Sequence, residues 1–247
     1  MFAPKDIVQI SRLSHVIIEQ VLEGKIDPRA TIRELQRISQ GDLHPVYDWT
    51  PPHWWPGLQA QIDLIKRTLP GFDIPSPPSS FIPSSPCSVL LLHVPASLHT
   101  QFDRIKPPLG FSKEHSLLNE VSAGKKKIVS INGHVEPRLI TWVEFDPMFG
   151  RGVPPVQLEN EPDLAGSEIL SAMFQFPGWV EDWGIGSPRP HMSAYRIEDV
   201  EGNTVGVPAV CKNVGRGTID LFQGRVDMSH RSWASPKAKS LTPMPAL

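Results

Sequence analysis

Proline is the residue that most limits what this chain can fold into, because it removes a backbone donor and fixes φ. The sequence has 27 prolines among its 247 residues, and ten of them fall between positions 45 and 86. Since proline is excluded from helix interiors and central strands, much of the chain has to be ordered loop, turn or tail. The prolines of 45–86 mark the best candidate boundary in the chain.

The proline pattern divides the chain into four predicted regions. They are an N-terminal helical region at 1–69, a Pro/Ser-rich linker at 70–86, an α+β domain at 87–235 and a flexible tail at 236–247. The linker reads PGFDIPSPPSSFIPSSP, and its prolines and serines are typical of an extended, polyproline-like segment.

Helical periodicity characterises the chain before the linker. Apolar residues at helical spacing predict two helices within the first 44 residues and a third, amphipathic helix from Leu58 to Leu69. Pro70 ends the third helix. We expect the N-terminal helices to dock on the sheet through Ile10, Ile17, Ile62 and Ile65.

After Pro86 the pattern changes to strands. The run SVLLLHV at 88–94 is continuously apolar, which predicts a central strand buried on both faces. Strands are also predicted at 127–132 and 138–145, and Asn132-Gly133 between them is typical of a hairpin turn. The lysines of Gly124-Lys125-Lys126-Lys127 are interpreted as keeping the entry to a strand soluble.

Further strands are predicted at 191–197, 204–212 and 218–228, and helices at 97–105, 112–121 and 163–176. Ser112 and Asp163 are the candidate N-caps of the last two helices. The predicted fold class is therefore α+β, with N-terminal helices followed by a mixed, mainly antiparallel sheet and its covering helices.

Charge and cysteine usage exclude several classes of protein. The net charge of −2 argues against a general affinity for nucleic acid or anionic membrane. Cys87 and Cys211 fit neither a disulfide framework nor zinc spacing, so buried free thiols are expected, with a disulfide left open if their strands are neighbours. The first residues do not predict a signal peptide, and no apolar run is long enough to span a bilayer. We expect a soluble cytoplasmic protein without metal, cofactor or anchor.

The segment DWTPPHWWP supplies the candidate ligand-binding residues, Trp49, His53, Trp54 and Trp55. Tryptophans on a loop fixed by prolines can form a stacking platform for a sugar, a base or a peptide. The rings can instead fold inward and hold an irregular loop against the rest of the chain. We favour the second interpretation, because large aromatic side chains are usually buried.

Polar residues near the C-terminus supply candidate catalytic residues. The polar residues that could converge on one face of the last sheet are His191, Asp220, Arg225, Asp227, His230 and Arg231. Asp220 and Arg225 lie on opposite faces of a regular strand, unless Gly224 is a bulge that resets the register. His93 ends the predicted strand at 88–94. Alternating polar residues are, however, expected on any strand with one solvated face. The catalytic candidates are His93, His191, Asp220, Arg225 and His230.

Three functions follow from these observations. The preferred one is a non-catalytic binding or protein-interaction module, whose partner is another protein or a small ligand. The alternative is an enzyme with a dispersed His/Asp/Arg site on the C-terminal sheet. The least favoured is nucleic-acid contact through a basic C-terminal set, Lys212, Arg216, Arg225, Arg231, Lys237 and Lys239.

Overall fold

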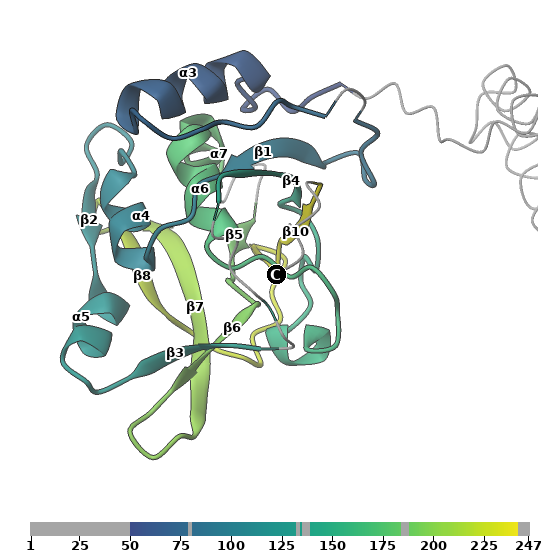
Figure 1. The fold of residues 1–247 in the computed structure, drawn as a ribbon. Helices are drawn as coiled ribbons and strands as arrows, with labels where there is room; N and C mark the ends of the chain where they lie inside the picture. Colours follow the sequence, from purple (N-terminus) through teal and green to yellow (C-terminus); the bar gives the residue numbers. More distant parts are fainter. Residues whose placement is uncertain (1–49, 79–80, 132–133, 135–138, 184–187, 242–247) are drawn as a thin grey trace, which may run out of the picture. The chain divides into compact units, whose positions relative to one another are not determined.

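The computed structural model describes residues 50–78, 81–131, 134, 139–183 and 188–241 (Figure 1), all within one compact unit that begins at Thr50. The predicted helices of the first 44 residues, with Ile10 and Ile17, lie outside these residues. The helices, labelled as in Figure 1, are α3 (Leu58–Thr68), α4 (Leu98–Arg104), α5 (Ser116–Ser122), η1 (Pro155–Leu158), α6 (Glu168–Gln175) and α7 (Pro177–Glu181). The strands are β1 (Val89–His93), β2 (Ser112–Glu114), β3 (Lys127–Ser130), β4 (Thr141–Asp146), β5 (Arg189–Pro190), β6 (Tyr195–Glu198), β7 (Thr204–Asn213), β8 (Thr218–Gly224), β9 (Trp233–Ala234) and β10 (Lys237–Ser240).

The fold is α+β, as the sequence predicts, and its strands form three sheets. The first has the order β1-β4-β10, the second the order β2-β8-β7-β6-β3, and the third pairs β5 with β9. All pairings are antiparallel except β2 with β8 and β5 with β9.

The hairpin predicted around Asn132-Gly133 is wrong, because the strands on either side of these residues do not pair with each other. β3 pairs with β6, whereas β4 pairs with β1 and β10. Burial explains the difference, because the first five residues of β4 are buried and need neighbours on both sides, whereas β3 is only half-buried. A local turn signal is overridden here by the burial of a more apolar strand.

β1 is buried at all five residues, but it lies at the edge of its sheet rather than at the centre. Side chains replace the missing neighbour strand. The Gln61 carboxamide donates to the Leu90 carbonyl (3.0 Å) and accepts from the Leu92 N–H (2.9 Å), as a paired strand would. Trp55 Nε1 also donates to Leu90 (2.9 Å), and Gln175 Nε2 donates to the Leu92 carbonyl (2.7 Å). The edge is therefore closed without an additional strand.

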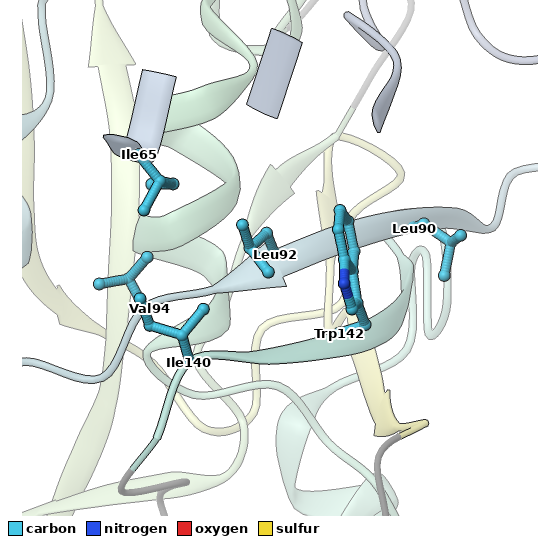
Figure 2. Packing of buried hydrophobic residues seen from close by; sticks show 6 residues of the cluster. All are labelled: Ile65, Leu90, Leu92, Val94, Ile140 and Trp142. Atoms are coloured by element: carbon cyan, nitrogen blue, oxygen red, sulfur yellow. The ribbon is translucent and has the colours of Figure 1, made fainter. Parts of the chain in front are cut away.

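One core cluster lies between α3 and the first sheet. Figure 2 shows Leu90 and Leu92 on either side of the Trp142 ring, with Ile65 reaching toward them from α3. Val94 and Ile140 complete the set. The predicted amphipathic helix is thus confirmed as α3, and Ile65 is fully buried. The opposite face packs on α6 and α7, where the Phe145 and Trp179 rings meet edge to face at 5.4 Å.

The proline-rich segment 70–86 lies against this core where the structure describes it. Ile74 and Phe81 pack against the cluster, and Trp142 Nε1 donates to the Pro75 carbonyl (2.8 Å). Backbone without regular pairing is thus anchored by side chains from the sheet. The domain boundaries given by the proline pattern stay a prediction.

Several predicted element ends differ in the structure. Ser112 begins β2 instead of capping a helix, and α5 begins at Ser116. Asp163 does not cap α6, which begins five residues later. The N-cap position of α6 is Ser167, whereas Asp163 has φ of 59° and its carbonyl accepts from the Ala238 N–H. That bond helps to hold β10, although the sequence predicts fraying there.

Candidate functional site

His93, the first catalytic candidate, is fully buried at the end of β1. Its Nδ1 lies 3.1 Å from the Ser171 hydroxyl, which in turn contacts Gln101 Oε1 at 3.1 Å. The Val94 N–H also reaches the Ser171 oxygen, at 3.3 Å. This network connects β1 to α4 and α6 in the interior, so its geometry is that of a packing contact between elements.

His191 directly follows β5 and forms a β-bridge with Ala209 of β7, and 1% of its surface is exposed. Its ring stacks on Trp233 with centroids 4.6 Å apart and planes 8° apart. Neither ring nitrogen has a hydrogen-bond partner among the described residues. Burial lowers the pKa of His191 to about 4, so the ring is neutral at neutral pH. Gly224 is required here, because a Cβ would lie 3.2 Å from the imidazole and 2.9 Å from Ala209 Cβ.

Asp220 lies on the same sheet face as His191. A β-bridge pairs His191 with Ala209, and Cys211, two residues along β7, pairs with Asp220. The Asp220 carboxylate accepts from the Ser116 hydroxyl at 2.9 Å and from its N–H at 3.3 Å, which anchors the start of α5. The register between β7 and β8 is continuous from Thr218 to Gly224. Gly224 is therefore not a bulge.

The remaining candidates of this set form local pairs at the surface. Arg225 makes a two-pronged contact with Asp227, at 2.9 and 2.7 Å, which lowers the pKa of the Asp227 carboxyl. His230 Nδ1 lies 2.7 Å from the Ser232 hydroxyl. Arg231 is exposed, and its carbonyl accepts from Arg151. None of the contacts described for these four residues reaches His191 or Asp220.

Arg189 and Glu114 were missed by the sequence reasoning and belong to the same face. Continuing the antiparallel register from the His191–Ala209 bridge places Arg189 opposite Cys211, and Glu114 pairs with Asp220. Burial raises the pKa of the Cys211 thiol, and the charge of Asp220 raises it further. No sequence signal identified this row, because it depends on the pairing of four strands.

The described part of the tryptophan segment has its rings against the rest of the chain. Trp54 is buried against Phe176 and Trp179, with centroids 5.7 and 6.2 Å apart. Trp55 is half-buried with its indole N–H on β1, whereas His53 is exposed. Trp49 lies outside the described residues. The described rings hold the proline-rich loop against the first sheet.

The two cysteines add no further candidate site among the described residues. Cys87 and Cys211 are free, and neither is fully exposed. Among the described residues, no three histidine, cysteine or acidic side chains are placed to hold a metal ion. None of the helices described is both long and apolar enough to cross a bilayer.

The basic C-terminal set is partly engaged within the chain. Lys212 Nζ donates to the Glu181 carbonyl, and Lys237 pairs with Glu161 at 2.9 Å while lying 3.9 Å from the Phe149 ring centroid. Arg225 is held by Asp227. These contacts place three of the six side chains against the protein rather than free for phosphate groups.

A different feature, the outer edge of β3, has unpaired backbone groups. Ile131 N–H donates to the Ala194 carbonyl at 3.0 Å, and the same register pairs Val129 with Arg196. Because hydrogen-bonded pairs alternate in an antiparallel ladder, Val129 directs its N–H and C=O toward β6, and Ile131 directs its N–H the same way. The Ile131 carbonyl accepts from the His134 N–H at 2.9 Å. The corresponding groups of Ile128 and Ser130 point to the other side. No described residue forms a hydrogen bond with them.

Three other edge strands, β1, β10 and β9, offer a contrast. β1 is closed by the glutamine and tryptophan side chains described above. β10 is covered by Asp163 and Leu164, and β9 by Gly152, whose N–H donates to the Trp233 carbonyl at 2.9 Å. β3, which follows α5 and lies beside β6 in Figure 1, has no such cover within the described chain. Its outer edge is the candidate functional site.

No protein-family model, curated protein or solved structure matches this chain. Function is therefore inferred from the geometry of the described residues.

Proposed function

We propose that this chain is a non-catalytic protein-interaction module that binds an extended segment of a partner along the outer edge of β3. The observation that supports this is the outward direction of the N–H and C=O groups of Ile128 and Ser130. Unpaired strand edges are templates for another strand, and several peptide-binding domains use them in this way.

The side chains of β3 suit such a partner. Ile128 and Val129 are half-buried on opposite faces of the strand, so an added strand would extend apolar contact on both faces. Each backbone hydrogen bond contributes roughly 0.5–1.5 kcal/mol net, and the two outward residues offer four groups. Affinity from so short an edge is modest, as expected for a reversible interaction.

A titration with an uncharged peptide tests the proposal. The probe is an end-blocked peptide of alternating threonine and valine, added to isotope-labelled chain while amide chemical shifts are recorded. We expect saturable shifts confined to Lys127–Ile131 and the facing β6 residues. A second peptide, N-methylated at alternate positions so that it lacks the required donors, should not bind.

Two substitutions at Ile128 separate backbone pairing from side-chain contact. Ile128→Pro removes an outward N–H without removing a bond to β6, so it should abolish peptide binding while the fold is retained. Ile128→Val keeps the N–H and should bind. Leu109→Ser controls for apolar adhesion, because Leu109 is the most exposed large apolar side chain of the described residues, at 102%. Equal binding by the proline variant would refute the proposal.

We also propose a cytoplasmic location. The free thiols of Cys87 and Cys211 support it, since thiols persist in reducing compartments.

A further inference from the structure

We infer that the partner segment bound at β3 is acidic at the end that lies beside Lys125 and Lys127. This inference rests on the proposed function, because it names the class of partner for the same edge. The observation that carries it is the uneven distribution of charge along the strand.

Three consecutive lysines lead into β3, and only one of them has an acidic partner. Lys126 forms an ion pair with Glu120 on α5. Lys125 and Lys127 are exposed and make no ion pair with any described residue. Two cations are therefore available at the N-terminal end of the open edge.

The backbone defines where these two lysines lie along the chain. Lys125 N–H donates to the Glu120 carbonyl at 3.0 Å, and Gly124 N–H donates to Val121 at 3.0 Å. Gly124 has φ of 70°, a conformation that favours glycine, so the turn from α5 into β3 is defined. Positive charge at one defined end of the edge gives orientation as well as attraction to a charged partner.

One acidic side chain opposes this charge. Glu198 is the cross-strand neighbour of Lys127 on β6 and is half-buried. It lowers the net positive charge at this end of the edge, but its side chain forms no ion pair with Lys127. At the other end of the edge, Ser130 and Ile131 carry no charge. The edge is thus positive at one end and neutral at the other, which favours an extended segment with acidic residues at one end only.

Lysines at an edge have another established use, which is to prevent unwanted strand pairing. The two roles make opposite predictions. Lysines that guard the edge keep the chain monomeric and leave the affinity for different peptides unaffected. Lysines that recognise a partner change the ranking of peptides by charge.

The test compares four end-blocked peptides that share the threonine–valine core. One is uncharged, two carry a pair of glutamates at either the first or the last positions, and one carries a pair of lysines. We expect one acidic peptide to bind about tenfold more tightly than the uncharged peptide at low salt, and the lysine peptide to bind most weakly. The advantage of the acidic peptide should fall as salt is added.

Charge reversal in the protein completes the test. The double variant Lys125→Glu with Lys127→Glu should prefer the lysine peptide, whereas Lys66→Glu on the exposed face of α3 should behave as the unaltered chain. Circular dichroism of each variant verifies that the fold is retained.

The outcomes distinguish the inference from the proposed function. Equal, salt-independent binding of acidic and uncharged peptides would overturn the inference and leave the strand-binding function standing. Self-association of the double variant without a change in peptide ranking would assign the lysines to edge protection and overturn it as well. Binding of no peptide, or a dimer whose β3 amides are protected by a second copy, would overturn both.

Discussion

At the scale of single residues, His191 couples the stability of the fold to pH. Its folded pKa of about 4 lies below its ordinary value of 6.5, because burial disfavours the charged ring. Below the ordinary value the unfolded chain binds a proton that the folded chain does not. The free energy of unfolding should therefore be highest above about pH 6.5 and fall by about 2–3 kcal/mol as the pH is lowered to about 4.5.

Urea unfolding of the unaltered chain and of His191→Phe at these two pH values measures the effect. Phenylalanine preserves the stack on Trp233 but has no titrating group, so this part of the pH dependence should disappear. An unchanged pH dependence in the variant would mean that other groups are responsible.

Gln61 offers a second prediction at this scale, because its carboxamide acts as a neighbour for β1. Gln61→Leu should leave the Leu92 N–H buried without an acceptor and cost about 1–3 kcal/mol. Gln59→Leu, on the exposed side of the same helix, should cost less than about 0.5 kcal/mol. Chemical unfolding of both variants provides the comparison, and equal losses would contradict the role assigned to Gln61.

Residue periodicity could predict the burial of Ile65 but not the role of Gln61. An amphipathic stripe defines which aliphatic residues face a core, whatever that core is. A glutamine within a helix has no local signal for burial, and its function depends on a strand about 30 positions away in sequence. The Arg189–Cys211–Asp220–Glu114 row was inaccessible for the same reason.

At the scale of elements, the direction in which each β3 amide points predicts how much a proline substitution at that residue destabilises the fold. Val129→Pro removes an N–H that bonds to β6 and should destabilise the fold by about 3 kcal/mol. Ile128→Pro removes an outward N–H and should cost less than about 1 kcal/mol. Thermal unfolding of the two variants measures the difference. A larger loss for Ile128→Pro would show that the register has been assigned to the wrong face.

The sequence predicts some elements well and others poorly. β7 and β8 follow from apolar strands joined by a glycine-containing turn, and α3 follows from its stripe. β9 and β10 span two and four residues and pair with β5 and β4, which lie far away in sequence, so no local pattern indicates them. The Asn132-Gly133 signal failed to give a β3–β4 hairpin, because burial placed β4 between β1 and β10.

At the scale of the whole molecule, composition and pattern were sufficient for the α+β class but not for its division into separate sheets. An open edge is a property of strand order and not of any one segment, so the candidate site could not be read from the sequence. From the sequence alone, the lysines at 125–127 are interpreted only as keeping the entry to a strand soluble. Their proposed role in recognition depends on the unpaired edge beside them.

The most direct test of this account is amide hydrogen exchange of the free chain, resolved at each residue of β3. We predict that Val129 and Ile131 exchange slowly and that Ile128 and Ser130 exchange fast, with the fast pair becoming protected when the acidic peptide is added. Slow exchange of all four amides in the free monomer would show that the edge is already paired within the chain, and would contradict its assignment as a binding site.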